Sequence, residues 1–303
     1  MYNKSTLKII INFLLAFLSE VFALKITVIL NDKKAISISC SKVITQYLKT
    51  KNVDLFLPSD KAGYPLDECR MVDFSGVDIA VVVGGDGTML GASRLLRRFG
   101  TAIVGVNMGR LGFLAEIEVS DILPALDRIV EENYFIEKRM LLYGQISREG
   151  NIIGECYALN DLVINKSAFA RPVVLDLEID GQTVGSYRGD GLIVASPTGS
   201  TAYAFSAGGP LLTPNLELLS VVPVCPHTFF TRPYILSRDS IVKIKYRSES
   251  GYASCLADGQ SLGLLQQDDE VIVRIAEEKI SLLHLKQPQF FERVKEKLLH
   301  GSL

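Results

Sequence analysis

The chain has 303 residues, which is enough for two domains of ordinary size. Hydrophobic residues make up 48% and charged residues 22%, and the formal net charge of −2 comes with no dense Lys/Arg tract, which argues against nucleic acid as the main partner. The five cysteines are odd in number and form no Cys-x-x-Cys pair, so we expect reduced thiols rather than a disulfide framework or a zinc site.

The first 23 residues allow two interpretations. Lysines precede an apolar run over residues 9–18, and Val21-Phe22-Ala23 resembles a cleavage site, so the segment imitates a secretory signal peptide. The run is too short to span a membrane comfortably. Alternatively, translation begins near Leu24, where a typical opening strand starts, and residues 1–23 are an appendage or a mis-annotated start. We favour the second interpretation.

Residues 24–138 alternate strand and helix patterns. Apolar runs predict strands at residues 24–30, 53–57, 77–83 and 102–106. Helical spacing predicts helices at residues 36–48, from residue 89 onward, and from 120 to 130 with Ser120 as the N-cap. This alternation favours a mostly parallel sheet flanked by helices.

From Arg139 onward the pattern changes to short strands separated by turn signals such as Asp180-Gly181. Strands are expected at residues 141–147, 159–164, 173–179, 191–195, 241–246 and 271–275, and an amphipathic helix at 289–299. We therefore expect an α/β N-terminal domain with a mostly parallel sheet and a mostly antiparallel, all-β C-terminal domain. The first would comprise residues 24–138 with 287–303, because the C-terminal helix returns to it, and the second residues 139–286.

The stretch Gly84-Gly85-Asp86-Gly87-Thr88 places one carboxylate in a tight turn between a buried strand and a helix. Open α/β folds bind ligands at this carboxyl edge of the sheet, and glycines let the backbone N–H groups approach a phosphate. Asp86 there suits proton abstraction, hydroxyl orientation or Mg²⁺ contact during phosphoryl transfer. The alternative is a structural Asp in an Asx-type turn.

A second loop, residues 188–210, combines an Asp190-Gly191 turn with a cluster of small hydroxyl residues over Thr198–Thr201. A strand ends at Ser196 and a short helix is expected near Thr201. Hydroxyls and free N–H groups at a helix start can bind phosphate or ribose. Ordinary N-capping by Thr198 or Ser200 would explain only one or two of these hydroxyls.

Together, these motifs make the chain resemble the NAD kinase family. Gly84 to Thr88 matches the family's GGDGT motif, which lipid kinases and phosphofructokinases share in related form. The full series is highly specific and runs in the family's order from about Lys25: Asn107 to Leu114 (N-x-G-x-L-G-F), Asn160-Asp161, Asp190-Gly191, Pro197 to Tyr203, Pro226-His227-Thr228 with Arg232-Pro233, and Asp258-Gly259-Gln260. Position 161 is Asp where the family more often has Glu.

The resemblance implies transfer of the ATP γ-phosphoryl group to the 2′-hydroxyl of the adenosine ribose of NAD, giving NADP. Asp86 would orient or deprotonate that hydroxyl, Gly87 would allow close approach of the nucleotide, and Phe113 would form an apolar wall. The implied contacts with NAD are Asn160 and Asp161 (ribose, nicotinamide side or adenine), Asp190 (nicotinamide amide), Arg171 and Arg188 (cleft), Thr201, Ala202, Tyr203, Ala204, Phe205 and Ser206 (adenine and ribose, with Tyr203 as a stacking face), and Gln260 (closing the pocket).

Mg²⁺ or another divalent cation is expected to bind together with the phosphoryl donor, and no metal site made by the protein alone is expected. The motifs do not distinguish ATP from polyphosphate as the donor. His227 is expected to be structural, and Arg110 either contacts phosphate or covers the loop. The family commonly associates, so a homo-oligomer is expected, in the cytoplasm and without a membrane or nucleic-acid partner. Two alternatives stay open: a lipid kinase of the diacylglycerol type, and a non-catalytic NAD-binding sensor, against which the intact Asp86 argues.

Overall fold

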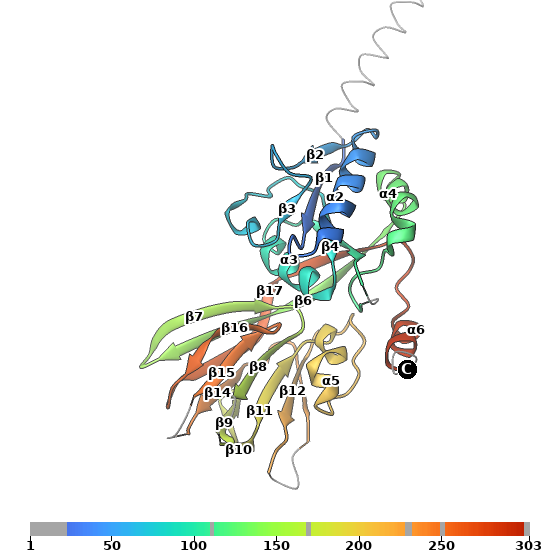
Figure 1. Ribbon diagram of the computed structural model, residues 1–303. Coiled ribbons are helices and arrows are strands. Elements are labelled where there is room, and N and C mark those ends of the chain that lie inside the picture. The colour runs from blue at the N-terminus through green and yellow to red at the C-terminus, as the bar shows by residue number, and fades with distance from the viewer. Residues whose placement is uncertain (1–22, 110–111, 168–170, 228–231, 249–251, 300–303) are drawn as a thin grey trace, which may run out of the picture.

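The computed structural model of the protein describes residues 23–109, 112–167, 171–227, 232–248 and 252–299. Figure 1 shows an α/β lobe built from the first third of the chain and a β lobe below it. Two long strands, β6 and β17, run from one lobe into the other. Residues 1–22, which the two interpretations of the N-terminus concern, lie outside the described residues. In the part of the chain that is described, no helix is long and apolar enough to cross a membrane.

The α/β lobe contains the predicted parallel sheet, with the strand order β2-β1-β4-β5. Its strands are β1 (Lys25–Leu30), β2 (Asp54–Phe56), β4 (Ile79–Gly84) and β5 (Ala102–Asn107), and the short β3 (Tyr64–Pro65) also pairs with β1. Almost every side chain of β1, β4 and β5 is buried, because helices cover both faces of a parallel sheet. The N-terminal part of the predicted fold is confirmed.

Three helices form the outer layers of this lobe. Helices α2 (Ala35–Leu48) and α4 (Ile122–Val130) share one apolar cluster on one face of the sheet, and α3 (Asp86–Leu96) packs into a separate cluster on the other. The predicted N-cap at Ser120 is wrong. Ser120 lies inside a 3₁₀ turn, Val119–Asp121, and α4 starts after it with no side-chain cap. Burial of the apolar side of α4 stabilises the helix without a cap.

The β lobe is a sandwich of two layers. One layer is an antiparallel sheet of six strands among the described residues: β13 (Tyr234–Leu236), β12 (Leu219–Val224), β11 (Gly191–Ala195), β8 (Asp161–Lys166), β15 (Ala253–Ala257) and β16 (Gln260–Leu265). The other layer contains β7 (Asn151–Ala158), β9 (Val173–Ile179), β10 (Gln182–Gly189) and β14 (Val242–Tyr246) with parts of β6 and β17. One large apolar cluster fills the space between the layers, which confirms the predicted antiparallel β architecture.

Strands β6 (Phe135–Arg148) and β17 (Glu270–His284) join the sheet of the α/β lobe to one layer of the β lobe, so that these form one continuous sheet. The start of β17 pairs antiparallel with β14, whereas Ser281 and Leu282 near its end pair in parallel with β5. The strand predicted to end at residue 275 therefore continues to 284. Its pairing with β6 shifts register between Ile275 and Lys279, so a bulge interrupts the alternation that the sequence pattern relies on.

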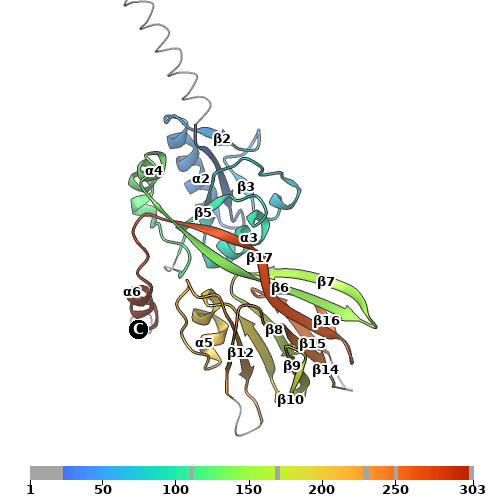
Figure 2. The same cartoon turned by 180° about the vertical axis from the view of Figure 1, so that it is seen from behind.

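The remaining elements lie around the junction of the lobes. The hydroxyl-rich loop folds into a 3₁₀ turn (Thr198–Thr201) followed by the short helix α5 (Tyr203–Ser206), as expected. The C-terminal segment forms helix α6 (Phe290–Val294) and continues as a π-type turn over Lys295–Leu299. Figure 2 shows α6 at the end of an extended segment, beside the junction and apart from both sheets. All five cysteines are free.

Candidate active site

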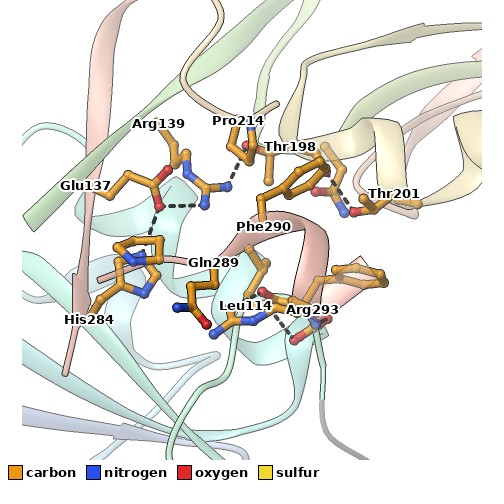
Figure 3. A pocket seen from close by; sticks show the side chains of 15 residues that line it. Leu114, Glu137, Arg139, Thr198, Thr201, Pro214, His284, Gln289, Phe290 and Arg293 are labelled. Atoms are coloured by element: carbon orange, nitrogen blue, oxygen red, sulfur yellow. Dashed lines mark hydrogen bonds and ion pairs between the residues drawn. The ribbon is translucent and has the colours of Figure 1, made fainter. Parts of the chain in front are cut away.

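A cavity of about 170 Å³ lies at the junction of the two lobes (Figure 3). Three parts of the molecule form its wall: the α/β lobe, the β lobe, and the C-terminal segment with the ends of the shared strands. The lining residues are Asp86, Phe113 and Leu114; Asn160, Thr198, Thr201, Ala202 and Pro214; and Glu137, Arg139, His284, Pro288, Gln289, Phe290 and Arg293.

Asp86 is the first residue of α3, directly after the carboxyl end of β4. Its Oδ2 accepts the backbone N–H of Phe113 at 2.7 Å, and its Oδ1 accepts those of Leu114 at 3.1 Å and Ala115 at 3.2 Å. The carboxylate is therefore bound to the loop after β5 rather than to its own turn, and the Asx-turn alternative does not describe it. A side chain at Gly112 would place its Cβ 1.8 Å from Asp86 Oδ1, so this close approach requires glycine.

The hydroxyl-rich turn across the cavity is capped by a residue the sequence did not suggest. Ser196 Oγ accepts the N–H of Gly199 at 3.1 Å and donates to the carbonyl of Leu159. Thr198 and Ser200 do not cap the turn, so the alternative of ordinary N-capping does not describe them: Thr198 Oγ1 accepts from Arg139, and Ser200 is bonded to the backbone of Leu212. Because Ser196 supplies the cap, the hydroxyl of Thr198 lies in the cavity wall.

Asp258 holds the turn that presents Asn160 to the cavity. Its fully buried carboxylate accepts the N–H groups of Leu159 at 3.0 Å, Asn160 at 2.8 Å and Asp161 at 3.3 Å, and it forms an ion pair of 2.7 Å with Arg94 of α3. The backbone at Asp258 is left-handed, with φ of 47°, in a tight turn with Gly259. The Asp-Gly-Gln motif marked this turn in the sequence, but nothing in it signalled the ion pair with α3.

Asp161 follows Asn160 and is 5% exposed. Burial raises the pKa of its carboxyl to about 7, the negative charge of Asp258 adds to that rise, and the backbone N–H of Tyr203 opposes it. Asp161 thus lies behind the cavity wall, where its charge depends on pH near neutrality.

A buried ionic network forms the far wall of the cavity, and sequence reasoning missed it. His284 lies between two carboxylates, with Nδ1 2.6 Å from Glu116 and Nε2 3.0 Å from Glu137, and Arg139 pairs with Glu137 at 2.6 Å. Although burial opposes it, these carboxylates raise the pKa of His284. Likewise burial raises the pKa of Glu137, but the hydrogen bonds of His284 and Arg139 outweigh it and lower the value to about 2. The members are far apart in the chain, so no local motif marks them.

The other predicted residues fall into two groups. Gly87 is exposed next to Asp86, Gln260 is exposed after the Asp258 turn, and α5 exposes Tyr203, Phe205 and Ser206 over a buried Ala204. Arg171, Arg188 and Asp190 lie at the opposite end of β11, whose five residues span about 16 Å at ~3.3 Å each. There Asp190 forms an ion pair of 2.7 Å with Lys166, so the structure does not bring this second group into the cavity.

Comparison with known protein families identifies the family to which the chain belongs. The family model of the ATP-NAD kinase N-terminal domain matches residues 6–134, and that of the ATP-NAD kinase C-terminal domain matches residues 159–285. The chain belongs to the NAD kinase family. The N-terminal match begins at residue 6, upstream of the Lys25 from which the resemblance was expected to run.

Individual NAD kinases agree with this over nearly the whole chain. The NAD kinase of Heliobacterium modesticaldum is 38% identical over 278 residues, which are 90% of this chain and 98% of that one. The NAD kinase of Moorella thermoacetica is 40% identical over 263 residues, or 86% and 84% of the two chains.

Solved structures give the same architecture. The Archaeoglobus fulgidus NAD kinase in complex with ATP superposes with a TM-score of 0.70 at 27% identity, covering 91% of this chain and 98% of that one. The yeast NADH kinase complexed with NADH gives a TM-score of 0.78 at 20% identity, covering 93% and 89%, and supports the fold alone.

Proposed function

We propose that the protein is an NAD kinase, which transfers the γ-phosphoryl group of ATP to the 2′-hydroxyl of the adenosine ribose of NAD to give NADP and ADP. The observation that carries this is the carboxylate of Asp86 in a cavity that also receives Asn160 and Thr198 from the other lobe. A lipid kinase shares the glycine-rich loop, but the family match extends over both lobes. A non-catalytic sensor would have no need of an oriented carboxylate at this point.

In the proposed reaction, Asp86 acts as the general base. Each carboxylate oxygen has two lone pairs. Oδ1 already accepts two backbone N–H groups, whereas Oδ2 accepts one, so Oδ2 has room for the proton of the ribose hydroxyl. As that proton moves to Oδ2, the ribose oxygen forms the new P–O bond, and the bond between the γ-phosphorus and the β,γ-bridging oxygen breaks.

We further propose that the acceptor extends along β11. The adenosine ribose would lie beside Asn160 and Asp161, with adenine against the exposed ring of Tyr203 on α5. The nicotinamide end would reach the group at the other end of β11, where Asp190 could accept hydrogen bonds from the amide and Arg171 and Arg188 are exposed. A homo-oligomer and a cytoplasmic location belong to this proposal on the family resemblance.

Mg²⁺ or another divalent cation would enter with the donor. In the ranges that the structure describes, no three His, Cys, Asp or Glu side chains converge to hold a metal ion. The chain therefore fits a cation whose ligands are mainly phosphate oxygens and water, as is usual for Mg²⁺ with nucleotides. Its chemistry there would be to neutralise charge on the donor phosphates.

The test is Asp86→Asn. An amide cannot take the proton, so we expect kcat to fall by roughly 10²- to 10⁴-fold, while thermal unfolding shows that the protein remains folded. Asp60→Asn, an exposed carboxylate in the same lobe, is the control and should keep full activity. Turnover above about half of the parent rate would exclude Asp86 as the base.

The donor and acceptor are tested together on the unmodified protein. NAD, NADH and diacylglycerol are each assayed with ATP and with polyphosphate, in the presence of Mg²⁺ and of excess chelator. NADP formation that requires the divalent cation supports the proposal. Phosphorylation of the lipid, or NAD binding without any product, would replace it with one of the alternatives.

A further inference from the structure

The C-terminal segment supplies a side of the cavity that no motif indicated. Pro288, Gln289, Phe290 and Arg293 line the same space as Asp86. Figure 3 shows Gln289, Phe290 and Arg293 gathered beside Leu114, below Arg139 and Thr198. A ligand in this cavity therefore meets α6 as well as the two lobes.

Arg293 is joined to the catalytic carboxylate through one peptide unit. Its Nη1 donates to the carbonyl of Phe113 at 2.8 Å, and the N–H of Leu114, in the same peptide unit, donates to Asp86 Oδ1 at 3.1 Å. Its Nη2 is 3.4 Å from Glu116 Oε2. The guanidinium thus places a permanent positive charge next to the site of phosphoryl transfer.

Lys297 adds a second cation on the same helical segment. It follows Arg293 by four residues, a spacing that keeps two side chains on one side of a helix. Desolvation and the nearby Arg293 lower its pKa, whereas the carboxylates of Asp86, Glu296 and Glu118 act to raise it. Lys297 does not itself line the cavity, but this spacing places it on the same side of the segment as Arg293, which does.

The other cations of the cavity are already matched by carboxylates. Arg139 is paired with Glu137, and His284 lies between Glu137 and Glu116. Phosphoryl transfer needs positive charge around the donor phosphates beyond what one metal ion supplies. Among the described cations that line this cavity, Arg293 has the longest ion pair, 3.4 Å to Glu116, and Lys297 follows it on the same segment.

Helix α6 also has few contacts with the protein interior. None of its residues is buried, and Phe291 is 68% exposed. Figures 1 and 2 both show it at the end of an extended segment, beside the junction of the lobes. Elements with few buried contacts open at low free-energy cost, and lids over active sites are drawn from them.

We propose that α6 and the turn after it form a donor lid, in which Arg293 and Lys297 bind the phosphate chain of the phosphoryl donor next to Asp86. This proposal rests on the proposed function, since it assigns the donor side of the same site. It predicts that the lid affects ATP and leaves the dinucleotide site, on α5 and β11, unchanged.

The experiment compares Arg293→Gln and Lys297→Gln with Lys295→Gln, an exposed cation of the same segment. Loss of one charge-assisted hydrogen bond should raise KM for ATP roughly ten- to a hundredfold, with KM for NAD changed less than about twofold. Lys295→Gln should match the parent protein. Equal rises in both KM values, an equal effect of the control, or no effect at all would overturn the lid.

Calorimetric titration of MgATP in the absence of NAD separates this proposal from the proposed function. Weaker ATP binding by the two variants supports the lid even if no NADP is formed, a result that would refute only the NAD kinase assignment. Failure of the parent protein to bind ATP would overturn the lid. If Arg293→Gln does not fold, Lys297→Gln decides, because no hydrogen bond recorded for Lys297 holds the described structure together.

Discussion

The carboxylate of Asp86 owes its orientation to a loop 27 residues further along the chain. Three successive N–H groups, from Phe113 to Ala115, fix both oxygens, and Gly112 leaves the space for them. In the proposed reaction, a base that is held in place before the substrate arrives needs no reorganisation. The GGDGT loop thus supplies the carboxylate, and the N-x-G-x-L-G-F segment supplies the N–H groups that orient it.

Asp161 is the residue whose environment opposes its charge. Its pKa of about 7 exceeds the ordinary 3.8, so the folded state holds a proton that the unfolded state releases. Its contribution to stability is therefore complete below about pH 4 and is lost as the pH rises through 7.

Asp161→Asn removes this penalty. We expect the free energy of unfolding to increase on the order of 2–4 kcal/mol at pH 8 and hardly at all at pH 4. Urea unfolding at both pH values measures it, with the exposed Asp239→Asn as control. A variant less stable than the parent at pH 8 would show that favourable contacts of the Asp161 carboxylate outweigh the cost of burying its charge.

At the scale of elements, α3 connects the cavity to the β lobe. Its first residue is Asp86, and its last turn carries Arg94, which reaches Asp258 in the turn between β15 and β16. That turn in turn fixes the backbone of Asn160. The helix therefore sets the distance between the carboxylate of Asp86 and Asn160 on the opposite side of the cavity.

Arg94→Ala leaves the carboxylate of Asp258 buried without its cation. Removing one member of a buried ion pair costs about 3–5 kcal/mol, and we expect the lower end because three N–H groups remain on Asp258. At about 2–4 °C per kcal/mol, Tm should fall by roughly 10 °C.

Calorimetry on Arg94→Ala and on Arg98→Ala, an exposed arginine just beyond the same helix, gives the comparison. Equal Tm values for the two variants would mean that the Arg94–Asp258 pair contributes nothing to stability.

At the scale of the whole molecule, the shared strands β6 and β17 connect the two lobes directly. β6 supplies Glu137 and Arg139, β17 ends at His284, and the α/β lobe adds Glu116. Because Arg139 reaches Thr198 and Arg293 reaches Glu116, the network also touches the β lobe and α6.

The stabilisation by this network decreases both towards alkaline and towards acidic pH. The pKa of His284 is raised, so its contribution is full below its ordinary 6.5 and is lost as the pH rises through the folded value. The pKa values of Glu116 and Glu137 are lowered, so their contribution is full above about 4.5 and is lost towards acid. The network stabilises the protein most between about pH 4.5 and 6.5.

His284→Gln should cost about 3 kcal/mol at pH 5.5, because two partly buried carboxylates lose their shared cation. The cost should be smaller at pH 9, because the parent protein loses that charge as the pH rises through the raised pKa of His284. Urea unfolding at the two pH values checks this, with the exposed His227→Gln as control. A cost that does not change with pH would show that His284 is neutral in the folded protein.

The sequence by itself determined the local pieces. Strands 173–179 and 191–195 were predicted with the bounds that the structure has, and Asp86 was placed correctly between strand and helix. These follow from the alternation of apolar residues and from turn glycines, which act over a few neighbouring residues. The family motifs also marked Asn160 and Thr201, both of which line the cavity.

Only the tertiary structure decided which distant residues meet. Arg94 and Asp258 are 164 positions apart, and Glu116 and His284 are 168 apart. The second half of β17 was hidden because its charged residues and the bulge break the strand pattern. Pairing across such separations is selected by burial of apolar surface and by the need of buried charges for partners, which depend on the assembled fold.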